Sequence, residues 1–174
     1  MPTRPLIVRT DDLEFEPCVV RTDFSDEAAW QQVLRRCNDN PDFPTGINPA
    51  AIVDDPAFDG ATIEEIRAAV AADDHLPVFF VADAVTMRGE QPLLAVQVDD
   101  EDDDDDELDD DEDDEFDDDD EDYDDDVESP AGQPFRLLPE QVLSVHGNLA
   151  LANMDFDEFG PGAADPTTYI HCGF

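Results

Sequence analysis

The chain has 174 residues, of which 49 are acidic and 8 are basic, so its formal net charge is −41. Residues 99–128 alone hold 20 Asp and 6 Glu and no basic residue. The remaining 144 residues keep a net charge of −15 and are long enough for one folded domain. A nucleic-acid-binding surface and a polybasic membrane patch both need clustered basic residues, so this charge excludes both classes.

The cysteines and the N-terminal residues favour a cytoplasmic protein. Cys18, Cys37 and Cys172 are an odd number without paired spacing, which is not the pattern of a disulfide framework. The apolar stretch 6–8 is too short for the core of a signal peptide, and no run approaches the roughly 18 apolar residues of a membrane span. All eight basic residues are arginines, which indicates a bacterial genome of high GC content.

The first part of the chain predicts a strand, a helix and a second strand. Residues 17–24 have the valine-rich pattern and the proline boundary of a strand. A helix follows, with Ser25 as its predicted N-cap. Its apolar face is formed by Ala29, Trp30, Val33, Leu34 and Cys37. Residues 50–54 predict the second strand, and residues 6–11, which echo 18–23, are interpreted as an edge strand or an N-terminal extension.

A second helix has the clearest local signal in the chain. Thr62 and Glu65 have the spacing of a capping box, in which each side chain bonds the backbone amide of the other residue. The apolar face of this helix is formed by Ile63, Ile66, Ala69 and Val70. Residues 78–82 are continuously apolar, as expected of a central strand that is covered on both faces.

The remaining elements are predicted on both sides of the acidic run. Residues 93–98 and 135–138 predict two further strands. The segment 141–153 has a helical pattern that we expect to be interrupted at Gly147. Beyond it, Asp155 is placed to cap a short helical turn. A last strand is expected at 169–171.

The order of these elements predicts one α/β domain formed by residues 1–98 and 129–174. Strands that alternate with helices indicate parallel crossovers, and the short connection before residue 93 indicates an antiparallel pair. The expected fold is a mixed β-sheet with βαβ crossovers, followed by an antiparallel strand pair and a C-terminal helical segment. The acidic residues 99–128 are an insertion between two strands, which costs little because loop-closure entropy grows slowly with length.

Residues 99–128 are predicted to form a disordered acidic insertion. Asp is a weak helix former and is depleted in strands, and the few apolar residues cannot offset the ordering entropy. One interpretation is that the run only keeps the protein soluble. Another is that it attracts a basic protein, with Leu108, Phe116 and Tyr123 as apolar anchors among the acids. The run has no glycine, which excludes an EF-hand calcium loop.

The sequence contains none of the familiar catalytic or cofactor motifs, so we expect no cofactor and no metal. Cys18 and Cys37 lie in apolar patterns, which favours buried thiols over nucleophiles paired with His146. Asp23 and Asp83 follow predicted strands at their carboxyl ends, where open α/β sheets bind ligands. They are the candidate ligand site, although helix capping and loop solvation explain them as well.

Three stretches carry a resemblance to a known family. They are VRTDFSD at 20–26, followed by an Ala-Trp pair, VDDPAFDG at 53–60 and NLALANMDFDEF at 148–159. Together they resemble a family of small actinobacterial domains of unknown function. The resemblance covers 18–98 and 135–159 and implies no particular activity. The acidic run departs from the short connection that the family has at this place.

These observations predict an uncharacterised, non-catalytic interaction domain that binds a basic protein partner. Small acidic immunity and antitoxin proteins are comparable in charge and size, and the comparison is by analogy only. The alternative is a small ligand-binding domain or enzyme that uses Asp23 and Asp83.

Overall fold

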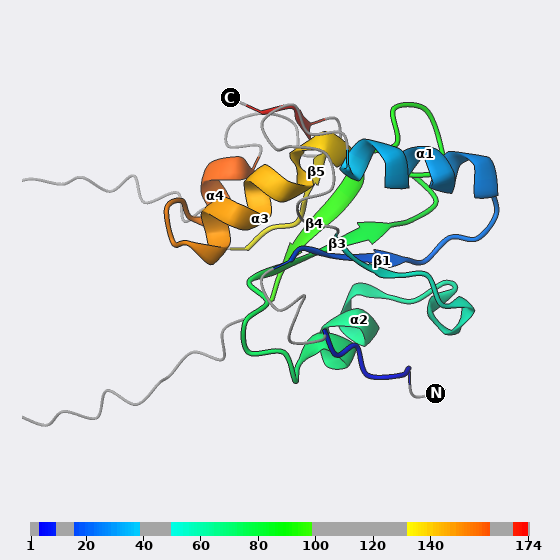
Figure 1. The fold of residues 1–174 in the computed structure, drawn as a ribbon, viewed down its shortest axis with the longest axis horizontal. Coiled ribbons are helices and arrows are strands. Elements are labelled where there is room, and N and C mark those ends of the chain that lie inside the picture. Colours follow the sequence, from blue (N-terminus) through cyan, green and yellow to red (C-terminus); the bar gives the residue numbers. More distant parts are fainter. Residues whose placement is uncertain (1–3, 10–15, 39–49, 99–131, 161–168, 174) are drawn as a thin grey trace, which may run out of the picture.

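The computed structural model of the chain describes residues 4–9, 16–38, 50–98, 132–160 and 169–173. These residues form an α/β fold around one mixed sheet, whose six strands have the order β2-β1-β3-β4-β5-β6. The helices lie on both faces of the sheet, with α1, α3 and α4 on one side and α2 on the other (Figure 1). The predicted fold class is therefore confirmed.

The elements follow the predicted order along the chain. The strands are β1 (Cys18–Arg21), β2 (Ala51–Val53), β3 (Val78–Ala82), β4 (Leu93–Gln97), β5 (Phe135–Leu137) and β6 (Ile170–His171). The helices are α1 (Glu27–Cys37), α2 (Ile63–Val70), α3 (Val142–Ala150) and α4 (Phe156–Phe159), with 3-10 turns η2 (Pro56–Phe58) and η3 (Pro139–Gln141). None of the helices in the described ranges has the length and apolar character needed to cross a membrane.

Both predicted kinds of strand pairing are present. β1 runs parallel to β2 on one side and to β3 on the other, so Cys18 lies opposite both Ala51 and Phe79. β3 and β4 are antiparallel, as are β4 and β5. The acidic run joins β4 to β5, and its residues 99–128 lie outside the described part of the chain. The sheet ends with β6, which pairs parallel to β5.

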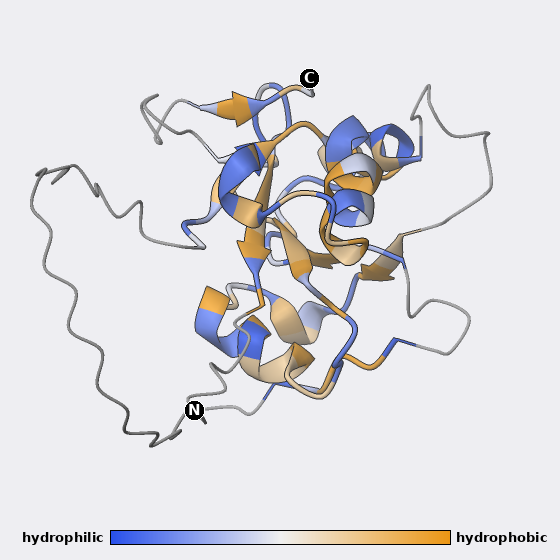
Figure 2. Ribbon diagram, turned by 90° about the vertical axis from the view of Figure 1, so that its left-hand side faces the viewer, coloured by the Kyte–Doolittle hydropathy of each residue, from blue (hydrophilic) through white to orange (hydrophobic). Residues whose placement is uncertain are grey.

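Alternate residues of the central strands enter two apolar clusters, one on each face of the sheet. Val19 and Phe80 belong to the cluster beneath α1 and α3, which also contains Trp30. Cys18 and Phe79 belong to the cluster beside α2. Figure 2 shows largely apolar strands lying between helices that contain both apolar and polar residues. Two clusters of this kind explain why the central strands read as continuous apolar runs.

Two of the predicted helix details are wrong. The N-cap of α1 is Asp26, whose carboxylate accepts a hydrogen bond from the Ala29 amide at 2.9 Å, and not Ser25. Both residues are good N-caps, and they are adjacent, so their side chains alone did not decide the boundary. Helix α3 is not interrupted at Gly147, because its backbone keeps the helical conformation there. A single glycine costs about 1 kcal/mol inside a helix, which the surrounding packing can offset.

The capping-box prediction is confirmed at α2. The Glu65 amide donates to the Thr62 hydroxyl at 3.2 Å, and the Thr62 amide donates to the Glu65 carboxylate at 3.0 Å. A second capping box, formed by Asp155 and Glu158, begins the short helix α4. Both helices therefore begin where local side-chain hydrogen bonds satisfy the first free amides.

The N-terminal segment 4–9 is not an edge strand. It lies along α2 (Figure 1), with Ile7 buried in the apolar cluster beside that helix. The Ile7 amide donates to the Ala69 carbonyl at 2.8 Å. The echo of the β1 sequence therefore does not extend to structure, because this segment pairs with a helix and not with a neighbouring strand.

We expect His171 of β6 to make stability depend on pH. Its ring packs edge-on against Phe159 and Phe135, with centroids 5.5 and 6.3 Å away, and burial lowers the pKa of His171 below 6.5. The neutral ring is thus favoured by folding. The neutral ring's contribution to the free energy of unfolding is fully present above the pKa of the unfolded chain. It is lost as the pH falls from 6.5 toward the lowered pKa of the folded chain. The melting temperature of the native chain should fall more between pH 7 and 5 than that of His171→Phe. Equal falls would contradict this assignment.

Candidate functional site at the carboxyl edge of the parallel strands

The three parallel strands β2, β1 and β3 end at the same edge of the sheet, and each is followed by an acidic residue. Asp54 follows β2, Asp23 comes two residues after β1, and Asp83 follows β3. The chain leaves β1 toward β2 and leaves β3 toward β4, so the edge between β1 and β3 is the switch point of the sheet. Open α/β sheets commonly place ligands at such a point.

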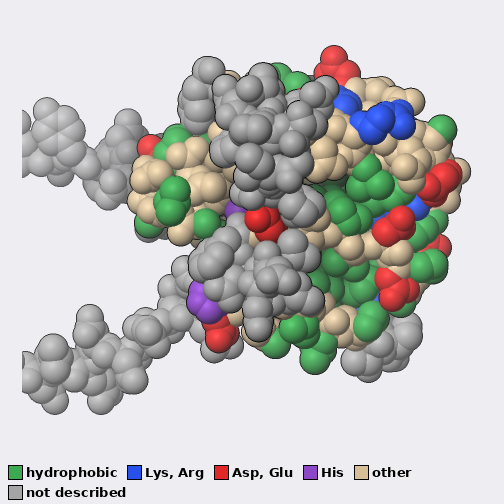
Figure 3. All heavy atoms as spheres, in the orientation of Figure 1, with side chains coloured by type: hydrophobic (Ala, Val, Ile, Leu, Met, Phe, Trp, Pro, Cys, Tyr) green, Lys and Arg blue, Asp and Glu red, His purple; other side chains and the backbone are tan. Residues whose placement is uncertain are grey.

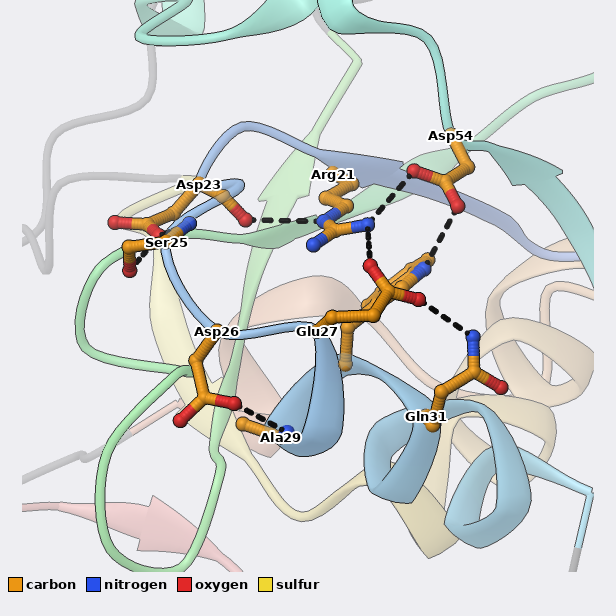
Figure 4. Close-up of polar contacts among 9 residues, drawn as sticks. Arg21, Asp23, Ser25, Asp26, Glu27, Ala29, Gln31 and Asp54 are labelled. Atoms are coloured by element: carbon orange, nitrogen blue, oxygen red, sulfur yellow. Dashed lines mark hydrogen bonds and ion pairs between the residues drawn. The ribbon is translucent and has the colours of Figure 1, made fainter.

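Arg21 lies at the centre of this edge, and its side chain is only 3% exposed. Its guanidinium donates to Glu27 at 2.9 Å, to Asp54 at 3.1 Å and to the Asp23 carbonyl at 3.0 Å (Figure 4). The same group also lies 4.3 Å from the centre of the Phe24 ring. The positive charge of Arg21 is therefore shared among protein groups that lie around the end of β1.

Trp30 ties α1 to this network. The indole Nε1–H donates to the second carboxylate oxygen of Asp54 at 2.9 Å, and the Arg21 guanidinium lies 5.2 Å from the Trp30 ring. Trp30 is fully buried, so its orientation toward the sheet is confirmed. Asp54 consequently joins the end of β2 to an arginine from β1 and an indole from α1.

Glu27 completes the network at the first turn of α1. Its carboxylate accepts hydrogen bonds from the Gln31 side chain at 2.9 Å and from Arg21. These two bonds, in that order, lower the pKa of Glu27 below its usual 4.5. A carboxylate in the first helical turn also faces the positive end of the helix dipole. The ionised form of Glu27 is therefore the form that this site stabilises.

The carboxylate of Asp23 forms hydrogen bonds within the turn that leads into α1. Its carboxylate accepts hydrogen bonds from the Ser25 hydroxyl and from the Ser25 amide, the latter at 2.8 Å. These bonds lower the pKa of Asp23, and the nearby charges of Arg88 and Arg21 act in the same direction. An ionised carboxylate with a lowered pKa is a poor general acid or base near neutral pH. The side chain is half-buried.

The carboxylate of Asp83 accepts more hydrogen bonds than the carboxylate of Asp23. Arg136 of β5 grips the Asp83 carboxylate with two hydrogen bonds of 2.9 and 2.7 Å, and the amides of Val85 and Thr86 donate to the same carboxylate at 3.0 and 3.1 Å. Burial alone would raise the pKa of Asp83, but these hydrogen bonds and the Arg136 charge outweigh it and lower the pKa below 3.8. Asp83 therefore joins the end of β3 to β5 across the intervening strand β4.

Asp23 and Asp83 thus lie at the same edge of the sheet, but their carboxylates accept hydrogen bonds from different residues. The backbone carries β1 and β3 together to that edge, where the Thr22 amide donates to the Ala82 carbonyl at 2.9 Å. Asp23 then turns to Ser25, and Asp83 to Arg136. The candidate ligand site consequently consists of ionised carboxylates that already accept hydrogen bonds from other residues of the chain.

The buried thiols lack the properties of a nucleophile. Burial raises the pKa of both Cys18 and Cys37 to about 12, and both side chains belong to the apolar clusters. A thiol of this kind carries almost no reactive thiolate near neutral pH. Among the described residues, no group of three or more His, Cys, Asp or Glu side chains is arranged to hold a metal ion. The candidate anchors Leu108, Phe116 and Tyr123 lie outside those residues.

Sequence reasoning missed the arginines that organise this edge. Arg21 ends a buried strand and Arg136 sits within one, and a charged residue in such a strand needs a partner to offset its desolvation. An arginine in a predicted strand therefore indicates that an acidic partner lies nearby in the fold. The sequence does not identify that partner, because Asp54 and Asp83 lie far from Arg21 and Arg136 along the chain.

The fold and the edge network define an α/β domain whose polar residues at the strand ends are tied together by arginines. A family model described as a domain of unknown function (DUF6924) matches residues 16–173, and the chain belongs to that family. The predicted resemblance to an uncharacterised domain family is thereby confirmed. Comparison with curated proteins and comparison with solved structures gave no match.

Proposed function

We propose that the chain is a non-catalytic interaction domain that binds a basic protein partner through its acidic residues. The observation that carries this proposal is the way its few cations are used. At least five of the eight arginines form ion pairs with carboxylates of the described residues. These arginines are Arg4, Arg9, Arg21, Arg36 and Arg136. Pairs of this kind neutralise the domain's cations internally and leave its acid excess available to a partner.

The surface supports the same proposal. On the face drawn in Figure 3, the basic side chains gather mainly at one end, above α1, and acidic side chains lie beside them and elsewhere on that face. A protein with this charge attracts basic surfaces over roughly a Debye length, about 8 Å at physiological ionic strength. Such fields speed association more than they strengthen the final complex.

The position of the acidic run also suits capture of a partner. The run joins β4 to β5, which are hydrogen-bonded neighbours with Ala95 opposite Phe135. The strands on either side of the run are therefore neighbours in the sheet, and the run brings 26 acidic residues to the stretch of chain between them. In this proposal Leu108, Phe116 and Tyr123 supply apolar contacts after the charges have brought the partner near.

The proposal is tested by isolating the partner with the full chain as bait and measuring its binding kinetics against salt. We expect a basic protein whose association with the full chain slows at least tenfold between about 50 and 300 mM salt, because screening removes the long-range attraction. Dissociation should change less, because it depends on short-range contacts.

Two variants separate charge from length and from apolar contact. In the first, each Asp of 99–128 becomes Asn and each Glu becomes Gln, which keeps the length but removes the charge; association should slow as it does at high salt. The second, Leu108→Ala with Phe116→Ala and Tyr123→Ala, keeps the charge and should mainly speed dissociation. Both should melt like the native chain, because the described residues outside the run already form an apolar cluster on each face of the sheet. A partner whose binding ignores salt and both variants would refute the proposal.

A ligand site at Asp23 and Asp83 is the second candidate, and the switch point between β1 and β3 is the observation that favours it. Asp23 is the better position for its test, because its contacts are confined to its own turn. Asp23→Asn should leave partner binding unchanged if the first proposal holds. If this variant abolished binding while the neutralised run did not, the second candidate would replace the first.

A further inference from the structure

We call residues 4–9 the strap. The strap occupies a surface that has the chemistry of a peptide-docking site. The strap lies along α2, as the dark blue segment beside that helix shows in Figure 1. Three of its residues make the contacts, and each does so at a different level of the helix. Arg4 reaches the first turn, Ile7 the last turn, and Arg9 the residues just beyond it.

The first contact is made by Arg4. Its guanidinium donates to the carboxylate of Glu65 at 3.2 Å and to the carbonyl oxygen of Ala57. Glu65 is the capping-box residue of α2, so its carboxylate accepts hydrogen bonds from the Thr62 amide and from Arg4 together. This end of the surface therefore presents a fixed carboxylate and a carbonyl to an incoming cation.

The second contact is made by Ile7. This side chain is 7% exposed, whereas its neighbours Leu6 and Val8 are 66% and 72% exposed. The alternation is that of an extended peptide, which inserts every second side chain. Its amide is satisfied by the Ala69 carbonyl, so one backbone hydrogen bond and one apolar side chain hold the middle of the strap.

The third contact is the most specific one. Arg9 and Asp73 form a two-pronged pair, with nitrogen–oxygen distances of 2.5 and 2.7 Å, and their side chains are 1% and 11% exposed. Arg9 also donates to the Glu16 carbonyl at 2.6 Å. A guanidinium fits this arrangement because its planar fork matches a carboxylate, which the ammonium group of lysine cannot do.

The surface and its occupant belong to different parts of the chain. Residues 16–173, which match the family model, contain α2, Ala57 and Asp73, whereas the strap precedes them. We therefore propose that the strap surface docks an extended segment of the basic partner, with an apolar residue between two arginines, and that this segment displaces residues 4–9. The inference rests on the proposed function and specifies the partner's chemistry.

A partner segment must compete with the strap for the same surface. A tethered segment acts at an effective concentration of about millimolar, so a free peptide of the same sequence binds the native chain weakly. Loosening the strap removes that competition and should raise the apparent affinity. The acidic run contributes separately, because it concentrates basic partners near the domain whatever the order of their residues.

The test uses a labelled peptide with the sequence of residues 1–10 and follows its fluorescence anisotropy with the full chain. Arg4→Ala combined with Ile7→Ala should bind this peptide at least about tenfold more tightly than the native chain does. Arg4→Ala alone, which leaves the apolar clusters intact, should show a smaller increase in the same direction. Circular dichroism establishes that each variant is folded.

Two controls separate this surface from general attraction by charge. A scrambled peptide of the same composition should bind the loosened variant at least about tenfold more weakly. Asp73→Asn in that variant should weaken binding of the native-order peptide, whereas Asp74→Asn, an equal charge change at an exposed neighbour, should not. Equal binding of the two peptides would overturn the docking surface and leave charge-driven binding by the run untouched.

The remaining outcomes are also decisive. If folded Arg4→Ala and the folded double variant bind the native-order peptide no better than the native chain does, the surface is not a docking site in trans. If the native chain forms a concentration-dependent dimer that both strap variants abolish, the occupant is the strap of a second copy and not a partner segment.

Discussion

Replacing Trp30 with Ala should cost about 3–5 kcal/mol of the free energy of unfolding. The side chain is fully buried between α1 and the sheet, and its indole N–H donates to Asp54. A domain of this size has about 5–15 kcal/mol of stability in total. The variant should therefore be marginally stable or unfolded at 37 °C, as measured by urea unfolding followed by circular dichroism.

A matched variant separates the packing of Trp30 from its hydrogen bond. Trp30→Phe keeps a large ring in the cluster but loses the donor to Asp54, and it should cost about 1–2 kcal/mol. Because Trp30 is the only tryptophan, the emission of the native chain reports on this site alone. We expect blue-shifted emission that iodide does not quench. A folded, stable Trp30→Ala would show that α1 is held to the sheet without it.

Replacing Asp83 with Ala should cost about 3 kcal/mol. Its carboxylate accepts two hydrogen bonds from Arg136 and two from backbone amides of the turn after β3. The variant leaves a partly buried guanidinium and two amides without these acceptors. Urea unfolding measures the loss, and Asp23→Ala, at the edge position whose contacts are local, should cost less than half as much.

The charge of Asp83 is tested separately by Asp83→Asn. This side chain keeps an acceptor for the amides of Val85 and Thr86 but loses the ion pair with Arg136, so about half of the cost should remain. Since the pKa of Asp83 is lowered by folding, its ionic contribution is present above pH 3.8 and is lost as the pH falls through the lowered value. The stability difference between native chain and variant should therefore shrink in acid. A constant difference would contradict the ion pair.

Local patterns predicted most of the fold. The capping box at Thr62 and Glu65 predicted where α2 begins, because both of its hydrogen bonds lie within four residues. The apolar run of β3 predicted a central strand, because a strand that is covered on both faces has apolar residues at successive positions. The apolar spacing around Trp30 correctly predicted which side of α1 faces the sheet.

The candidate site was much less predictable. Asp23 and Asp83 could be placed at strand ends from their positions in the sequence, but their partners could not. Arg136 reaches Asp83 across β4, and Arg21 reaches Asp54 across the edge of the sheet. Contacts between residues so distant in the chain leave no periodic pattern in one sequence. In an acidic chain, moreover, every arginine has many carboxylates from which to choose.

The position of the acidic run has a consequence for synthesis of the protein on the ribosome. Roughly 40 residues separate the last residue of β4 from the first of β5, so at 5–20 residues per second β5 emerges roughly 2–8 s later. During that interval the edge of β4 that later binds β5 is unpaired, and an unpaired apolar edge is a site of aggregation. The residues made next are almost all acidic, and two nascent chains that meet at this edge repel one another. We therefore expect the run to act as a gatekeeper for the exposed edge of β4 while the second half of the sheet is still being made.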